Sequence, residues 1–300
     1  MKINNKMKTS NSDRIFYLIT YSLMLIALAL VLLPIMNVIS CSISDPNQVM
    51  QGRVMFLPKG FSLAAYQTVL SDSKIVSGYA NTIFYTAVTT ILGVIVTIMC
   101  AYPLSRKDLK GRNFLMMVVT FTMLFSGGII PNYLLIRDLG LINNRWSLVL
   151  PGLINAYDII VARTFFQTTI PDDLLEAAKI DGCSNTKFII SIVLPLSKAI
   201  VAVLALYFMV ANWNAWFNAY LYINDAGKYP LQLVLKEILL ANSISAGEAG
   251  AASEAGVRMD ALSEVIKYAS ILVACVPIWC IYPFVQKYFI KGVMIGAIKG

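Results

Sequence analysis

The residues of this chain whose types and spacing suggest chemistry form a polar segment, 171–195, set between long apolar stretches. Pro171 suits a first helical position, where its missing N–H loses no hydrogen bond. Asp172 and Asp173 place negative charge at the positive end of a helix dipole, and Gly182 can adopt the left-handed conformation that ends a helix. The sequence therefore predicts about eleven helical residues, or roughly 16 Å of polar helix, which favours docking against another surface.

Bond-making chemistry is disfavoured because the usual groups are missing. Histidine is absent, which removes most catalytic triads and most zinc sites. The cysteines contain no Cys-x-x-Cys pair and are interpreted mainly as apolar packing residues: Cys41, Cys100, Cys183, Cys275 and Cys280. The sequence has no Gly-x-x-x-x-Gly-Lys-Ser/Thr phosphate loop. We therefore expect no enzyme activity, no nucleotide site, and no cofactor or metal on this chain.

The composition is that of a membrane protein. Hydrophobic residues make up 58% of the chain and charged residues 13%, compared with about 45–50% and 25% in soluble domains. Long charge-free stretches occur, for example between Arg14 and Asp45 and between Lys74 and Arg106. Each is long enough for the roughly 20 residues with which a helix crosses a bilayer. A basic segment precedes the first stretch, but that stretch is too long for a signal peptide and is interpreted as a retained span.

The predicted fold is an all-α polytopic membrane protein with six transmembrane helices. The expected spans lie near residues 15–39, 79–103, 113–135, 146–166, 189–211 and 268–288. The predicted organisation is an N-terminal tail at 1–14, a six-span domain at 15–288 and a C-terminal tail at 289–300. Within the domain, the polar helix belongs to a loop at 167–188, and a long loop connects the last two spans at 212–267.

The distribution of Lys and Arg predicts the orientation. The eight-residue turn from Ser105 to Arg112 holds four basic residues, and short loops have the greatest influence on topology. This turn is therefore expected in the cytoplasm, together with both termini and the 171–182 helix. The same bias accounts for the net charge of +8. Because no basic stripe is interleaved with exposed aromatic residues, we expect no nucleic-acid partner.

The polar segment resembles the EAA loop in the membrane subunits of ATP-binding-cassette importers. That pattern is Glu-Ala-Ala, a glycine four residues later, and Ile-x-Leu-Pro about ten residues beyond. An ordinary loop helix is the alternative, because Glu and Ala are common helix formers. The resemblance implies a type I importer fold and docking of this loop in a cleft on a separate ATPase. It assigns ATPase coupling to Glu176, Ala177, Ala178, Asp181, Gly182, Leu194 and Pro195.

Nearly the whole chain resembles the carbohydrate-uptake permeases, in particular the shorter permease of maltose-type importers. The segment 56–63 looks like the family's Leu-Pro-x-Gly-Phe-Ser, and 282–300 looks like its terminal signature. In the family this tail reaches toward the ATPase pair, which assigns a contact to Lys291, Gly292 and Gly296. An anchor at the membrane edge is the alternative.

Polar and aromatic residues near the ends of spans are candidates for the substrate path, because they suit the hydroxyl edges and apolar faces of sugars. An aromatic belt at the membrane interface is the alternative for the tryptophans, and simple helix kinks for the residues that follow Pro and Gly. The candidates are Asn132, Tyr133, Asn155, Asn212, Trp213, Asn214 and Trp216.

The stretch 243–256 is rich in Gly, Ser and Ala and is interpreted as a flexible linker within the external loop. The resemblance to maltose-type importers offers a second interpretation, because a loop between the last two spans there touches the external solute-binding protein. Docking of a binding protein on this loop is therefore a hypothesis.

The sequence predicts a permease subunit that forms half of the pathway of an ATP-driven importer for a carbohydrate, most simply an oligosaccharide. The expected partners are a second, non-identical permease, two ATPases that carry ATP and Mg²⁺, an external solute-binding protein and the lipid bilayer. The expected location is the cytoplasmic membrane of a prokaryote. Alternatives are a secondary transporter or channel, for which Asp158 is nearly the only intramembrane acid available for coupling, and a membrane scaffold.

Overall fold

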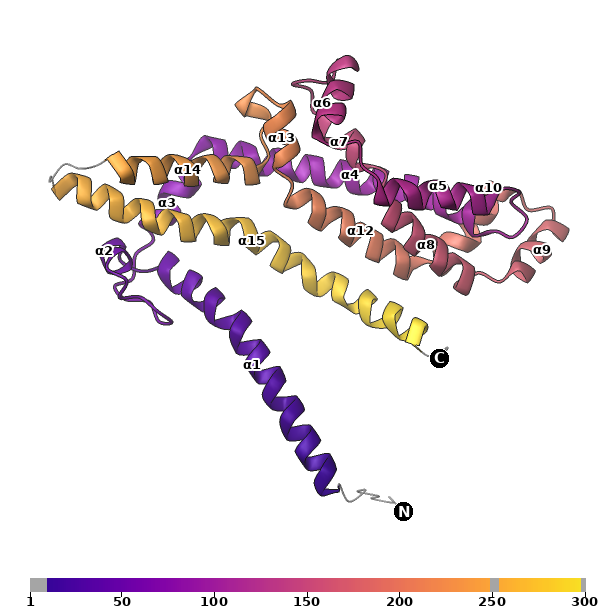
Figure 1. The fold of residues 1–300 in the computed structure, drawn as a ribbon, viewed down its shortest axis with the longest axis horizontal. Coiled ribbons are helices and arrows are strands. Elements are labelled where there is room, and N and C mark those ends of the chain that lie inside the picture. The colour runs from indigo at the N-terminus through magenta and orange to yellow at the C-terminus, as the bar shows by residue number, and fades with distance from the viewer. Residues whose placement is uncertain (1–9, 249–253, 298–300) are drawn as a thin grey trace. The chain divides into compact units, whose positions relative to one another are not determined.

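The computed structural model describes residues 10–248 and 254–297, with side chains described at 10–240 and 260–283. Over these ranges the backbone forms helices, and the β contact described is an isolated antiparallel bridge between Ser44 and Phe61. Three described helices are long and apolar enough to cross a membrane, and three bent helix pairs bring the possible total to six. The prediction of an all-α polytopic protein is confirmed (Figure 1).

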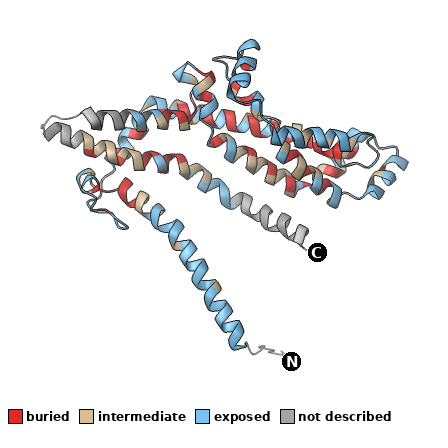
Figure 2. Cartoon of the chain, viewed as in Figure 1, coloured by how far each residue is buried: buried red, intermediate tan, exposed pale blue. Residues whose placement is uncertain are grey.

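The chain divides into two units, residues 1–71 with 241–273 and residues 72–240 with 274–300. The helices that begin in the first unit are α1 (Asn11–Ser42), α2 (Pro46–Met50), α3 (Ala64–Ser71) and α15 (Glu254–Ala297). No residue in the most apolar part of α1 is buried, and most are exposed (Figure 2). A helix that is apolar on all sides requires lipid or other helices around it.

The end of α1 is fixed by the segment that resembles the family's first external loop. Asn37 donates its side-chain amide to the carbonyl of Met55 at 2.7 Å, and Ser40 donates its hydroxyl to the carbonyl of Phe56 at 2.7 Å. Gly60 has φ +65°, and a Cβ at this position would lie 2.9 Å from Cβ of Asp45. Glycine is therefore required at this turn, and the segment covers the end of the first span.

The second unit is built around α4 (Ser73–Ser105), which matches the second predicted span. Three other predicted spans are bent pairs of helices. Their parts are α5 (Arg112–Leu124) with α6 (Ile129–Asp138), α7 (Trp146–Val149) and η1 (Leu150–Gly152) with α8 (Ala156–Thr169), and α10 (Asn185–Phe188), η2 (Ile189–Val193) and α11 (Leu194–Leu196) with α12 (Lys198–Trp213). The bends are 110°, 44° and 83°, respectively.

The bends have local causes. Gly128 adopts φ +85° between α5 and α6, a conformation that favours glycine. Pro195 follows a stretch of π-helix, because proline cannot donate the backbone hydrogen bond of an α-helix and its ring clashes with the preceding turn. The glycines and prolines singled out in the sequence therefore mark real breaks.

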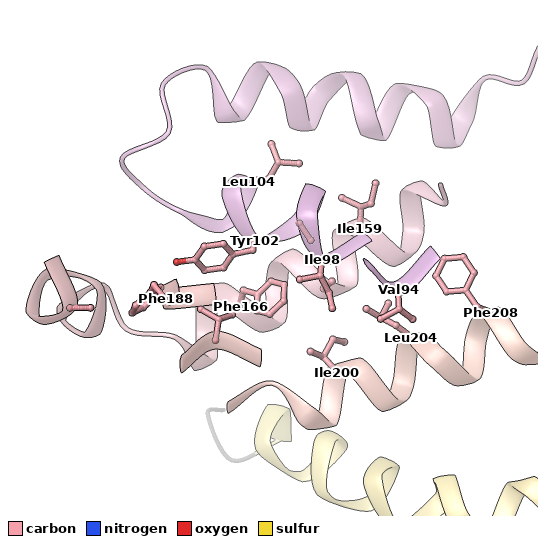
Figure 3. Close-up of a cluster of buried hydrophobic side chains, with 14 residues drawn as sticks. Val94, Ile98, Tyr102, Leu104, Ile159, Phe166, Phe188, Ile200, Leu204 and Phe208 are labelled. Atoms are coloured by element: carbon pink, nitrogen blue, oxygen red, sulfur yellow. The ribbon is translucent and has the colours of Figure 1, made fainter. Parts of the chain in front are cut away.

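An apolar core joins α4 to α8, α10 and α12 (Figure 3). The rings of Tyr102 and Phe166 meet edge to face with centroids 5.8 Å apart. A Cβ at Gly93 would lie 2.5 Å from Phe208, so glycine allows α12 to approach α4 closely. The aromatic end of this cluster lies next to the predicted coupling loop, and the core thereby connects that loop to the spans.

Threonines bury hydroxyl groups along the middle of α4. Among the described residues, the side-chain oxygens of Thr86, Thr89, Thr90 and Thr97 have no hydrogen-bond partner. The N-terminal part of the same helix differs, because Asn81 donates to the carbonyls of Gly227 and Tyr229, Tyr85 donates to that of Lys228, and Thr82 accepts from the backbone N–H of Leu231. The helix is thus tied near its ends and held by packing in its middle.

The region predicted as an external loop, 212–267, is largely helical. It contains α13 (Phe217–Tyr222), the 3₁₀ turn η3 (Ala226–Lys228), α14 (Leu231–Glu248) and the first turns of α15. The flexible-linker prediction is wrong for 243–248 and 254–256, which are helical because Ala and Glu favour helix more strongly than the few glycines oppose it. Residues 249–253 of that segment lie outside the described residues.

Candidate functional site

The predicted polar helix is present as α9 (Asp172–Ile180), which has nine residues. Pro171 has an extended backbone, with ψ 145°, and serves as the N-cap; the prediction that it is the first helical residue was wrong. Gly182 has φ +70°, as predicted, and its N–H donates to the carbonyl of Lys179 at 3.1 Å. The N–H of Cys183 donates to the carbonyl of Ala178 at 2.9 Å. These bonds satisfy carbonyls in the last turn, so α9 is a short helix with a defined end.

The predicted coupling residues of α9 divide between two sides of the helix. Glu176, Ala177, Asp181 and Gly182 are exposed, whereas Ala178 is 7% exposed and belongs to the apolar core. A small residue at position 178 lets the helix lie close to that core. The arrangement leaves the other four residues free to meet a partner.

The sequence interpretation missed one exposed apolar residue on α9. The side chain of Ile180 is 86% exposed, although it lies between the polar residues Lys179 and Asp181. It adds an apolar group to the exposed face of α9, beside the charged side chains. Its position among polar neighbours is the signal that could have identified it.

Leu194 and Pro195 belong to a different part of the structure. They lie on α11, at the bend of the fifth span, where Leu194 packs against the apolar core. They shape the return of the chain into the membrane and do not form part of the exposed face of α9.

A basic turn between α4 and α5, residues 106–111, contacts α9. Lys107 pairs with Asp172 at 2.7 Å, and Asp108 lies 3.7 Å from the ammonium of Lys179. The Arg106 guanidinium beside Asp108 holds the pKa of that carboxyl below its usual value. Its hydrogen bonds are the main cause, and the attraction between the two charges adds to them. Sequence reasoning used these charges for topology and missed their contacts with the coupling helix.

The C-terminal candidates lie on the last turns of α15. Lys291, Gly292 and Gly296 are within this helix, but their side-chain surroundings are outside the described part of the chain, as are residues 298–300 entirely. Their predicted contact with an ATPase remains a prediction.

Two substrate-path candidates meet in one cavity. Asn155 and Asn212 both line a space of about 520 Å³ at the break between η1 and α8, together with Tyr157, Asp158 and Tyr207. The side chain of Asn155 caps α8 by accepting from the N–H of Tyr157 at 2.9 Å. Asp158 is 4% exposed. The cavity therefore combines amides, aromatic rings and one carboxyl group.

The other candidates are engaged elsewhere. Trp213 is 6% exposed, and its indole N–H donates to the carbonyl of Ala274 at 3.0 Å, so it is a packing residue. Asn214 donates to the carbonyl of Val210 on its own helix, as Asn212 does to that of Phe208, but Asn214 does not line the Asn155 cavity.

The aromatic candidates and Asn132 also lie apart from this cavity. The ammonium of Lys236 lies 3.0 Å from the ring centre of Trp216, and Tyr133 stacks on Tyr222. Asn132 is exposed on α6. None of these is a lining residue of the Asn155 cavity.

Known proteins resemble the chain over nearly its full length. Residues 93–295 match the family model of the binding-protein-dependent transport system inner membrane component. The chain is 39% identical to the polygalacturonan/rhamnogalacturonan transport system permease protein YtcP of Bacillus subtilis, over 96% of this chain and 99% of the relative. It is 41% identical to protein LplC of the same species, over 91% and 90% of the two chains.

A solved structure agrees with these sequence relatives. The chain matches one from the crystal structure of a bacterial ABC transporter involved in the import of the acidic polysaccharide alginate, with a TM-score of 0.83 and 34% identity over 94% of this chain and 99% of the other. The helices, the exposed α9 and these matches lead to one assignment. The chain belongs to the family of binding-protein-dependent transport system inner membrane components and is a membrane permease subunit of an ABC importer.

Proposed function

We propose that this permease couples ATP hydrolysis on separate subunits to the import of an oligosaccharide, through insertion of α9 into a cleft on an ATPase. The observation that carries the proposal is the division of α9 into an anchored and a free side. Ala178 is buried against the permease core, whereas Glu176 and Ile180 are exposed. A partner would meet a short, closed helix that exposes both charged and apolar side chains.

The core provides a route from α9 to the spans. Ala178 belongs to the same cluster as Phe166 of α8, Phe188 of α10 and Tyr102 of α4 (Figure 3). Close-packed interiors transmit displacement because they compress little. A movement of α9 with the ATPase would therefore tilt these helices and change access to the pathway, with no covalent step on this chain.

The complex requires further subunits. We infer a second, non-identical permease, two ATPases that hold ATP and Mg²⁺, and an external solute-binding protein. The basic turn at 106–111 supports a cytoplasmic location for α9, and an even number of spans then places both termini in the cytoplasm. The exposed apolar surface of α1 is suited to lipid or to a neighbouring permease.

The cavity beside Asn155 is the part of this chain best suited to a sugar. Amide groups can donate to and accept from hydroxyls, Asp158 can accept from two hydroxyls, and the rings of Tyr157 and Tyr207 can cover apolar C–H faces. The carbohydrate named for YtcP and the polysaccharide named for the alginate transporter support a carbohydrate substrate. We therefore assign the cavity to a stretch of the sugar path.

A charge reversal on α9 tests the coupling. In the complete transporter in proteoliposomes, Glu176→Lys should lower ATP-dependent uptake by more than about tenfold, because reversing an interfacial charge commonly costs 2 kcal/mol or more. Glu237→Lys, on an exposed residue of α14, is the matched control. Uptake by Glu176→Lys equal to that of the parent would overturn the proposed role of α9.

The substrate class requires a separate measurement. Purified complex should show ATP hydrolysis that increases when binding protein and the correct glycan are both present. Neutral oligosaccharides and oligosaccharides that contain uronic acids should be compared at equal chain lengths. Failure of every glycan to stimulate a complex that responds to another solute class would reject the carbohydrate assignment.

A further inference from the structure

We propose that the turn at 106–111 is a clamp that positions α9 and carries its movement directly to the cytoplasmic end of α4. The inference rests on the proposed coupling role of α9. In the chain, α9 is joined to α8 before it and to α10 after it. The clamp adds a third connection, to the long central helix, which lies far away in the sequence.

The clamp holds α9 at both ends. Asp172, in the first turn, pairs with Lys107 at 2.7 Å. Lys179, in the last turn, lies 3.7 Å from Asp108. Attachment at a single point would leave a short helix free to swing, whereas two attachments separated by most of its length restrict its direction.

Arg106 connects the clamp to the segment beyond α9. Its side chain is 15% exposed, and two of its nitrogen atoms donate hydrogen bonds to the carboxylate of Asp108. The third nitrogen donates to the side-chain oxygen of Asn185 at 2.9 Å. Asn185 begins α10. A planar guanidinium held in this way has one defined orientation, which lysine cannot reproduce.

The last residues of α4 and the start of the turn are fixed to neighbouring helices through their carbonyl groups. Arg163 of α8 donates to the carbonyl of Leu104 at 3.0 Å, and Arg112 of α5 donates to that of Arg106 at 3.2 Å. These bonds use the carbonyls that are left free at the end of an α-helix. The clamp therefore moves with α4 and its neighbours.

The contact between the turn and α9 depends on side chains. A cavity of about 380 Å³ is lined by Arg106, Lys107 and Arg112 on one side and by Asp172 and Leu175 on the other. The ion pairs bridge these elements beside that space, so the contact between the turn and α9 can adjust through rotation of the side chains. The clamp is a set of adjustable links.

The two ion pairs are weak enough to position α9 without determining whether the protein folds. Lys107 and Asp172 are 77% and 47% exposed, and Lys179 and Asp108 are 53% and 52% exposed. Exposed ion pairs contribute little to the stability of the folded state. Loss of one pair should leave the protein folded but change how often α9 has the direction that the ATPase requires.

A charge exchange tests the clamp in the complete transporter in proteoliposomes, with sugar transported per ATP hydrolysed as the readout. Lys107→Asp and Asp172→Lys should each lower this ratio by about two- to threefold. The double variant, in which the two charges are exchanged, should return it to near the parent value. A merely structural role would change the amount of complex recovered rather than this ratio.

A second pair of variants tests Arg106. Arg106→Lys keeps the charge but loses the fixed fork, so it should lower the ratio nearly as much as Arg106→Gln. The exchanged pair Arg137→Asp with Asp138→Arg is the matched control, because these exposed residues pair with each other on α6, away from the clamp. Unchanged ratios in all clamp variants, or no recovery in the exchanged double variant, would overturn the proposal.

Glu176→Lys, measured beside these variants, separates the two hypotheses. If Glu176→Lys abolishes uptake while the clamp variants behave as the parent, the clamp is wrong and the coupling role of α9 stands. If Glu176→Lys has no effect, the coupling role itself fails.

Discussion

The coupling region and the Asn155 cavity use polar residues in opposite ways. Around α9 the charges are exposed and paired, as in Lys107 with Asp172. In the cavity, Asp158 is almost fully buried, and none of the ion pairs described includes it. Exposed pairs can separate and reform at little cost, whereas a buried polar group requires a partner. The first arrangement suits movement, and the second suits recognition of a ligand that brings its own hydrogen bonds.

The largest expected effect tests the anchored side of α9. Ala178→Leu should lower ATP-dependent uptake by more than about tenfold, because extra methyl groups in a packed core cost about 1–3 kcal/mol and would push α9 outward. ATP hydrolysis by the isolated ATPase should not change. Ala178→Ser, which adds less volume, is the control; equal uptake by the Leu and Ser variants would show that close packing here is unimportant.

A smaller effect is expected in the cavity. Asp158→Asn should raise the sugar concentration that gives half-maximal uptake by about tenfold, because the amide keeps one of the two acceptor oxygens and a hydrogen-bonding group left unpaired in a buried site costs about 1–3 kcal/mol. Co-purification of the subunits checks that the variant assembles, and Glu237→Gln provides an exposed acid for comparison. An unchanged concentration would remove Asp158 from the sugar path.

Asn155 links recognition in the cavity to the stability of α8. Replacement with Ala removes the N-cap bonds to Tyr157 and Asp158 and should lower the free energy of unfolding by about 1 kcal/mol. Thermal unfolding in detergent measures this change. Asn155→Ser retains a capping group, so an equal loss in both variants would contradict the capping explanation.

The smallest expected effect concerns pH. The pKa of Asp108 is lowered in the folded state from its usual value of 3.8. The charged carboxyl therefore stabilises the folded state fully above pH 3.8, and this stabilisation is lost as pH falls through the lower folded-state pKa. The ratio of sugar transported to ATP hydrolysed should therefore not change between about pH 6 and 8 on account of Asp108. A change in this range that disappears in Asp108→Asn would contradict that expectation.

The sequence was most informative where a local rule determines the structure. Charge-free stretches located the helical spans, and Gly182 correctly marked the end of α9. The sequence suggested a break or kink before Asn132, but the size of the 110° bend near Gly128 was not predicted, because glycine indicates only that a bend is possible. Neighbouring helices determine whether such a bend occurs.

Residues that act through distant contacts were the hardest to predict. Arg106 and Asn185 are far apart in the chain, and their hydrogen bond follows from tertiary packing. Trp213 is of a residue type that often binds sugars, but it is buried and donates a hydrogen bond to the helix that contains Ala274, so its role is to pack helices together. Residue type alone could not separate these outcomes, because each depends on which helices meet.

The threonines of α4 have a mechanical consequence. The N-terminal part of this helix is tied by Asn81 and Tyr85, and its C-terminal end by Arg163. Between these ties, the hydroxyls of Thr86 and Thr97 hold no partner among the described residues. The middle of the helix is therefore held by packing alone, so a small twist there breaks no side-chain hydrogen bond and would be passed from one tied end to the other.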